Sequence, residues 1–189
     1  DNICKNIHLP AQSGSNRILE LMKRSYTREW YLDRIKSIRT ILGDECGVSQ
    51  DMIAGFCSET EEDHQDTLSL LAEVEYDFGY MFAYSERPGT LAARRYEDDI
   101  DLVTKKRRLQ EIVDVQWTLS NESNKRDVGS IFEVLIEGNS KRNEAEWMGR
   151  NSQNKVVVFP KGNFNYQKGD YAKVKIHSFT KGTLLGEII

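Results

Sequence analysis

The sequence predicts two fold classes in one chain: an α/β domain over residues 1–124 and a small all-β domain over residues 125–189. In the first part, short apolar runs alternate with segments whose apolar residues recur every three or four positions, the pattern of alternating strands and helices. After residue 127, apolar and polar residues alternate one by one, as in strands with one buried face. Polar loops follow three of the expected strands.

The first strand is expected at residues 3–9, and the loop HLPAQSGS follows it. Proline, glycine and short polar side chains in this loop predict a turn, and a helix is expected from about Arg17. Ser13 and Ser15 could simply cap that helix, which is the alternative to a ligand-binding role. A second, amphipathic helix is predicted over residues 27–42.

Two further strands are expected at residues 48–56 and 76–84. After the first of these, Thr60 and Asp63 have the spacing of a capping box, which predicts the start of another helix. After the other, the turn SERPGT leads to a long helix over residues 101–121. The order βαβα predicts parallel strands joined by helices.

The second domain is predicted to be a small antiparallel barrel of about five strands, similar to an OB fold. Its short alternating runs are separated by glycine-containing turns at Gly138, Gly162, Gly169 and Gly182. The formal charge supports a boundary before this domain, because residues 1–125 carry a net charge of −7 and residues 126–189 a net charge of +3. A modest positive bias suits an accessory contact with nucleic acid.

Composition and termini predict a fragment of a cytoplasmic protein without a membrane segment. The chain has 39% hydrophobic residues, enough for a packed core, but no apolar run long enough to span a membrane. Its first residues lack the order of a signal peptide. The cysteines Cys4, Cys46 and Cys57 are too widely spaced for a disulfide framework, a zinc ribbon or an iron–sulfur motif.

In a βα barrel, the loops after the carboxyl ends of the strands line one face, where the chemistry takes place. Three polar loops after three strands therefore predict one shared site. The strings HLPAQSGSNRILELMKRSYTREWY, DMIAGFCSETEED and FAYSERPGTLAA together resemble the methylthiotransferase family of radical S-adenosylmethionine enzymes. The most similar branch is MiaB, which adds a methylthio group to an isopentenyl-type adenosine next to the tRNA anticodon. The segment from about Lys125 to GTLLGEII resembles the family's RNA-binding TRAM domain.

This resemblance implies the second half of an open, partial βα barrel followed by a TRAM barrel. The implied cofactors are S-adenosylmethionine and two 4Fe–4S clusters, whose cysteines would lie upstream of residue 1, so no cluster is expected in this fragment. The implied partners are the anticodon stem-loop of tRNA and a protein that reduces the cluster. Two alternatives stay open: a sister methylthiotransferase for a threonylcarbamoyl-type adenosine or a ribosomal protein, and a non-catalytic RNA-binding module.

The resemblance assigns cofactor binding to side chains of the three loops. These residues are Gln12, Ser13, Asp51, Ile53, Gly55, Glu59, Tyr84 and Arg87. Gln12 and Ser13 offer uncharged donors and acceptors, and Arg87 offers a planar fork for a carboxylate or phosphate. Asp51 could instead be a buried hydrogen-bonding partner. Family members commonly carry Pro-Gly where this chain has Cys57-Ser58.

The expected RNA contacts combine basic side chains with aromatic rings. They are Arg24, Tyr26, Lys155, Lys161, Lys173 and Lys175. The basic run at residues 105–108 is interpreted as solvated helix surface, because four consecutive helical residues point around the whole circumference. No catalytic residue and no metal ligand are expected in this chain.

Overall fold

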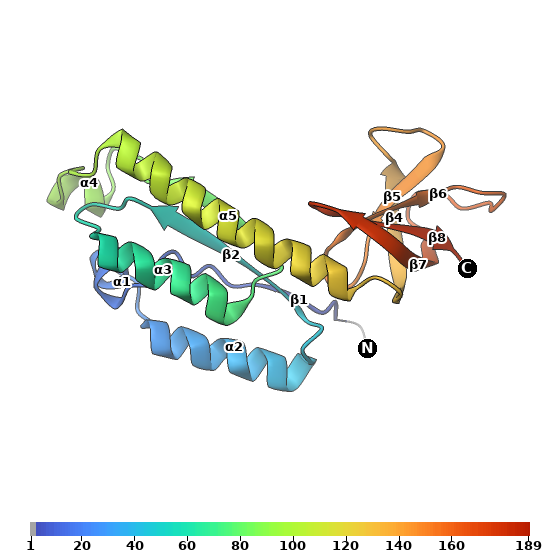
Figure 1. Cartoon of the computed structure of the whole chain (residues 1–189), viewed down its shortest axis with the longest axis horizontal. Helices are drawn as coiled ribbons and strands as arrows, with labels where there is room; N and C mark the ends of the chain where they lie inside the picture. The colour runs from blue at the N-terminus through green and yellow to red at the C-terminus, as the bar shows by residue number, and fades with distance from the viewer. Residues whose placement is uncertain (1–2) are drawn as a thin grey trace. The chain divides into compact units, whose positions relative to one another are not determined.

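The computed structural model describes residues 3–189 and divides into two compact units. The α/β unit comprises residues 8–44 and 48–119, and the barrel unit comprises residues up to 7, 45–47 and 120–189. The division falls inside helix α5 (Leu102–Arg126), which continues from one unit into the other (Figure 1). Each unit has its own hydrophobic core.

A three-stranded sheet in the order β1-β2-β3 forms the centre of the α/β unit. Its strands are β1 (Asn6–His8), β2 (Gly47–Ala54) and β3 (Phe78–Ala83). β2 and β3 pair in parallel, with Met52 opposite Met81. Beyond β1 the chain continues beside β2, where Gln12 forms a parallel bridge with Met52. The predicted parallel βαβ connection is therefore present, although each strand is shorter than expected.

Helices follow each strand, and their N-termini match the capping signals in the sequence. The helices of the unit are α1 (Asn16–Leu21), α2 (Arg28–Leu42), α3 (Glu61–Val74), α4 (Leu91–Arg95) and α5. Thr27 caps α2, and Thr60 forms the predicted capping box with Asp63 at the start of α3. Helix α5 ends at Arg126, beyond the predicted end near residue 121. The prediction stopped early because the last turns of the helix are polar and show no apolar periodicity.

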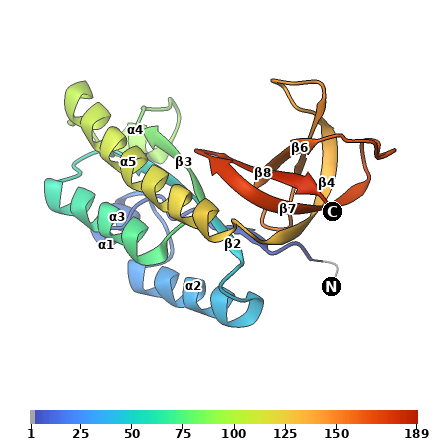
Figure 2. The same cartoon turned by 45° about the vertical axis from the view of Figure 1, so that its right-hand side comes forward.

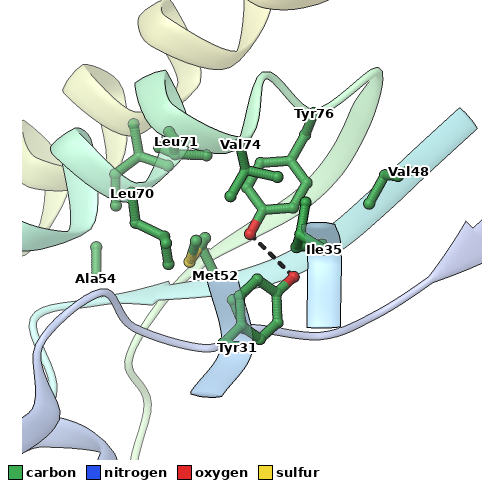
Figure 3. Packing of buried hydrophobic residues seen from close by; sticks show 11 residues of the cluster. Tyr31, Ile35, Val48, Met52, Ala54, Leu70, Leu71, Val74 and Tyr76 are labelled. Atoms are coloured by element: carbon green, nitrogen blue, oxygen red, sulfur yellow. Dashed lines mark hydrogen bonds between the residues drawn. The ribbon is translucent and has the colours of Figure 1, made fainter. Parts of the chain in front are cut away.

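The core of the α/β unit lies between one face of the sheet and helices α2, α3 and α5 (Figure 3). Alternate residues of β2 supply its sheet side, and Met52 at the centre has no exposed surface. Two buried tyrosines are linked by hydrogen bonds: the Tyr76 hydroxyl donates to the Tyr31 hydroxyl at 2.9 Å, and Tyr31 donates to the Leu9 carbonyl at 2.6 Å. These bonds connect α2 to the chain that leads into the first loop.

The other face of the sheet displays large aromatic side chains. Phe78, Tyr80 and Phe82 of β3 are 51%, 54% and 55% exposed. In the register of the sheet they lie beside Ser49, Asp51 and Ile53. Strand side chains alternate between the two faces of a sheet. One face of this sheet is therefore covered by helices, whereas the other leaves these aromatic rings exposed.

The barrel unit is a closed barrel with the strand order β4-β5-β6-β8-β7 (Figure 2). The strands are β4 (Ile131–Asn139), β5 (Glu146–Arg150), β6 (Val156–Pro160), β7 (Tyr171–Thr180) and β8 (Thr183–Ile188). The predicted strictly antiparallel barrel is wrong in one pairing, since β6 and β8 run parallel. A closed ring of five strands cannot alternate direction throughout, so at least one neighbouring pair must be parallel.

Burial along β7 alternates from residue to residue, as the sequence pattern predicted. Ala172, Val174 and Ile176 point into the barrel core, whereas Lys173 and Lys175 lie on its outer surface. Within residues 3–189, no helix combines the length and apolar character needed to cross a membrane.

Candidate functional site

The three strand-following loops come together at the carboxyl end of the sheet. A small apolar cluster contains Ile18 after the first strand, Phe56 and Cys57 after the second, and Tyr84 from the third. The rings of Phe56 and Tyr84 meet edge to face, with centroids 4.9 Å apart. Residues from all three crossover connections thus share one packing cluster, and the loops form one rim.

Polar contacts hold the same three loops together. The Arg17 guanidinium donates to the Ser58 carbonyl at 2.6 Å and to the Ser58 hydroxyl at 3.2 Å, which ties the first connection to the second. The Ser58 N–H donates to an Asp99 carboxylate oxygen at 2.7 Å, which ties the second to the third. The three loops are therefore fixed to one another at this end of the sheet.

Gln12 occupies a strained position in the first loop. Its φ of 68° lies in the left-handed region, although it is not glycine. Its backbone is held on both sides, because its N–H donates to the Asp51 carbonyl at 2.8 Å and its carbonyl accepts from the Ile53 N–H at 3.0 Å. Within residues 3–189 its side-chain amide makes no hydrogen bond, and the residue is 7% exposed. A side-chain amide on a fixed backbone, unused by the protein, suits a ligand with hydroxyl or carboxylate groups.

Ser13, by contrast, is used inside the loop. Its hydroxyl lies 3.3 Å from the Thr67 hydroxyl and accepts the Ser15 N–H at 3.2 Å. The Gly14 N–H donates to the same Thr67 oxygen at 3.0 Å. These contacts anchor the first loop on α3 and explain the burial of its serines. The predicted cofactor role of Ser13 stays a prediction.

Asp63 is the acceptor around which the start of α3 is organised. Its carboxylate accepts hydrogen bonds from the Ser15 hydroxyl, the Arg17 guanidinium, and both the N–H and the hydroxyl of Thr60. Burial alone would raise its pKa, but the bonds from Arg17, Ser15 and Thr60 together hold the pKa of Asp63 well below its ordinary value. Asp63 is therefore ionised in the folded protein and fixes the first loop to the second.

In the second loop, Gly55 and Glu59 contact each other. The Gly55 N–H donates to the Glu59 carboxylate at 2.8 Å, and Glu59 is 3% exposed. Arg108 of α5 donates to the same carboxylate oxygen at 2.9 Å. Sequence reasoning missed this role, because Arg108 and Lys105 were expected to be solvated and are each 5% exposed. The interpretation as solvated helix surface agrees with Lys106 and Arg107, which are exposed, and is wrong for Lys105 and Arg108. The spacing of three positions, which places the two buried side chains on one helix face, was the available signal.

Asp51 and Ile53 lie on the aromatic face of the sheet. Asp51 is partly exposed, and its carboxylate is 3.4 Å from His8 Nε2, while His8 Nδ1 is 3.0 Å from the Ser49 hydroxyl. The His8 ring also meets the Tyr80 ring edge to face at 6.3 Å. Asp51 is therefore not the fully buried hydrogen-bonding partner that the alternative to a cofactor role required.

The third loop contributes one half-buried and one exposed group, Tyr84 and Arg87. Burial and the hydrogen bond with Cys57 together raise the pKa of Tyr84 to about 12. The Lys105 ammonium lies 5.2 Å from the centre of the Tyr84 ring. Arg87 is exposed, and its guanidinium has no hydrogen bond or ion pair within residues 3–189. Arg87 is thus free to bind an anionic group at the rim.

The predicted RNA contacts fall into different environments. Arg24 is exposed, but the Tyr26 hydroxyl donates to the carbonyls of Pro10 and Ala11, so this tyrosine fixes the first loop. Lys155 is 11% exposed at its side chain and pairs with Asp127 at 2.6 Å, which leaves its ammonium little surface for a phosphate.

The other three predicted lysines stay accessible in the barrel unit. The Lys161 ammonium lies 4.3 Å from the centre of the Trp147 ring, in a cation–π contact. Lys173 and Lys175 are exposed on β7, where their strand neighbours include Glu133 and Glu187. The RNA assignment of these lysines stays a prediction, and the facing carboxylates reduce the local positive charge.

One charged cluster was not foreseen. Ligand atoms of Glu61, His64 and Glu111 all lie within 4.8 Å of one another. Arg107 already bridges this cluster, because its guanidinium donates to Glu61 at 2.7 Å and to Glu111 at 2.8 Å. The positive charge that a metal ion would supply is therefore provided by an arginine, and the cluster joins α3 to α5.

The three thiols of this chain lie in different environments. Cys46 and Cys57 are buried, whereas Cys4 is exposed. Burial also raises the pKa of the Cys57 thiol, which keeps it protonated at neutral pH. A cluster requires several thiolates that converge on one point. Cys57 belongs to the apolar cluster of the loops, and the expected absence of a cluster from this fragment stays a prediction.

The chain thus combines a three-stranded sheet, with loops that meet at its carboxyl end, and a small closed barrel. The chain is similar in fold to coproporphyrinogen III oxidase from Escherichia coli, a radical SAM enzyme, with a TM-score of 0.50 and 17% identity over 90% of this chain and 41% of that chain. The TRAM domain family matches residues 125–189.

Relatives found by sequence similarity carry a more specific name than the fold and domain matches. The chain is 63% identical over 188 residues to a tRNA-2-methylthio-N(6)-dimethylallyladenosine synthase of Amoebophilus asiaticus, matching 100% of this chain and 38% of the relative. It is 60% identical over 187 residues to the synthase of the same name from Parabacteroides distasonis, matching 99% of this chain and 40% of the relative. The chain is thus similar to these synthases over its whole length and spans about two-fifths of the length of these relatives.

Proposed function

We propose that this chain forms part of a tRNA methylthiotransferase that adds a methylthio group to C2 of an N6-dimethylallyl-type adenosine next to the anticodon. The match to the synthases over the whole chain supports the reaction. The observation that carries the proposal is the convergence of the three strand-following loops in one packing cluster. A site at this edge of a parallel sheet is where α/β enzymes bind their ligands.

In this proposal the three loops bind S-adenosylmethionine, which supplies the radical and methyl chemistry when bound. The side-chain amide of Gln12 binds the ribose or amino acid group, and the exposed guanidinium of Arg87 binds the carboxylate. Asp51 and Ile53 line the cofactor site on the aromatic face of the sheet. The iron–sulfur clusters belong to other parts of the full-length protein, as does contact with a reducing protein, and the enzyme acts in the cytoplasm.

The TRAM barrel provides the contact with the anticodon stem-loop. Exposed lysines such as Lys173 and Lys175 bind phosphates, and Arg24 adds a contact from the α/β unit. The matched TRAM family and the tRNA-directed names of the relatives support this assignment. The alternatives, a sister methylthiotransferase or a non-catalytic RNA-binding module, have less support because the similar relatives carry the name of the dimethylallyladenosine synthase.

Binding of a labelled anticodon stem-loop RNA should weaken steeply as salt rises from about 50 to about 200 mM, because phosphate contacts release counterions. The double variant Lys173→Gln/Lys175→Gln should lower the slope of log affinity against log salt by roughly 2, about one for each lost contact. Fluorescence anisotropy at several salt concentrations measures both. Lys36→Gln, on the exposed surface of α2, is the matched control and should keep the wild-type slope. An unchanged slope in the double variant would remove β7 from the RNA interface.

A further inference from the structure

Arg108 of α5 is a buried arginine whose guanidinium is directed at the second loop. Its side chain is 6% exposed, and that of its partner Glu59 is 1% exposed. Arg108 Nη1 donates to both the carboxylate and the backbone carbonyl of Glu59, each at 2.9 Å. Arg108 Nη2 reaches Glu61 at 3.3 Å. The guanidinium therefore holds both the side chain and the main chain of Glu59.

The other end of this connection is Gly55, the first residue after β2. The Glu59 oxygen that binds Arg108 also accepts the Gly55 N–H at 2.8 Å. Gly55 has a φ of +71°, which favours glycine, and a Cβ at this position would lie 2.4 Å from Lys105 Cγ. The loop is thus closed on itself by a carboxylate, and α5 packs directly against its first residue.

Such an arrangement fixes geometry more than it adds stability. A buried ion pair has a desolvation cost that largely offsets its attraction, yet removal of one partner leaves the other charge buried without compensation. Burial raises the pKa of Glu59 despite the hydrogen bond from Gly55 and the charge of Arg108. The main result of the pair is a single orientation for the peptide groups of residues 55–59.

We propose that Arg108 is a positioning residue for the candidate site: by holding the Glu59 carboxylate on the Gly55 N–H, it fixes the loop at residues 55–59 in the shape that binds S-adenosylmethionine. Arg108 acts through Glu59 and does not itself touch the cofactor. The inference rests on the proposed function and assigns to α5, outside the three loops, a part in cofactor affinity.

Two measurements on the whole chain test this proposal. Amide hydrogen exchange by NMR reports whether the Gly55 N–H stays bonded, and calorimetric titration with S-adenosylmethionine reports affinity. In Arg108→Gln, we expect Gly55 exchange to accelerate about tenfold or more and the affinity to fall about tenfold, as for the loss of a hydrogen bond to a charged group. Arg108→Lys keeps the positive charge but loses the planar guanidinium with its several donors, so the changes in Gly55 exchange and in cofactor affinity should both be intermediate.

Arg107→Gln is the matched control, because Arg107 neighbours Arg108 on α5 but pairs with Glu61 and Glu111 instead of Glu59. It should leave Gly55 exchange and cofactor affinity at their wild-type values. Should Arg108→Gln fail to fold, as judged by circular dichroism, the Arg108→Lys variant carries the test.

The outcomes distinguish the positioning role of Arg108 from the binding of S-adenosylmethionine by the loops. If the wild-type chain binds S-adenosylmethionine and Arg108→Gln binds it equally well, the positioning role is overturned. Unchanged exchange of the Gly55 N–H in the folded variant overturns it as well. If the wild-type chain shows no binding of S-adenosylmethionine, the proposed function of the loops fails instead, whatever the exchange data show.

Discussion

Gly14→Ala is expected to lower the free energy of unfolding of the α/β unit by about 3 kcal/mol, at the upper end of the cost of overpacking. A Cβ on Gly14 would lie 2.3 Å from the Asp66 carbonyl oxygen and 2.7 Å from Thr67 Cα. Both are backbone atoms of α3, so no side chain can move aside to relieve the clash. The loop must shift away from α3, and the bond from the Gly14 N–H to Thr67 must lengthen or break.

Urea unfolding followed by circular dichroism at the helical minimum measures this loss, because the helices belong mainly to the α/β unit. Gly182→Ala serves as the control, since a Cβ there meets no atom within 4 Å. The control should unfold at nearly the wild-type midpoint. Equal midpoints for Gly14→Ala and the wild type would show that the first loop does not pack on α3 as described.

Asp63→Asn is expected to destabilise the same unit by about 3 kcal/mol, because all the partners of this carboxylate are donors. The Ser15 hydroxyl, the Arg17 guanidinium and the Thr60 N–H and hydroxyl point at its two oxygens. An amide NH2 in place of one oxygen would face donors without an acceptor. Its side chain is 8% exposed, so water cannot replace the lost bonds.

The pH dependence gives this prediction a second readout. A carboxyl group with a lowered pKa in the folded state contributes stability above its unfolded pKa of about 4, and this contribution is lost as the pH falls through the folded pKa. The difference in unfolding free energy between the wild type and Asp63→Asn should therefore be full at neutral pH and shrink as the pH is lowered below about 4.

Asp66→Asn is the control for Asp63→Asn, since Asp66 is an exposed carboxylate on the same helix. It should cost little at any pH. A pH-independent difference between the wild type and Asp63→Asn would contradict the ionised, hydrogen-bonded state assigned to Asp63.

Much of the fold could be predicted because local signals agree with tertiary packing. Thr27 and Thr60 begin helices where the capping signals place them, and β7 alternates in burial as its sequence alternates in polarity. The convergence of the loops could be predicted as well, because parallel strands joined by helices carry their following loops to one edge of the sheet. These features depend on period and connectivity, which a sequence displays directly.

The contacts made by charged residues could not be predicted in the same way. Arg108, Lys105 and Lys155 have side chains with little exposure, and each meets a carboxylate outside its own helical turn or strand, namely Glu59, Asp98 and Asp127. Nothing in the local pattern of a basic run distinguishes a solvated lysine from a paired one. One parallel pair could be predicted, since a closed barrel of five strands requires at least one, but not that it would be β6–β8.

The most direct test of the shared site is a titration of the isotope-labelled chain with S-adenosylmethionine, followed by NMR through its backbone amides. Shifts confined to the loops that contain Gln12, Gly55 and Arg87, with no comparable shift in the barrel unit, are the predicted result. Shifts in only one of these loops, or at the opposite end of the sheet, would contradict a common cofactor site.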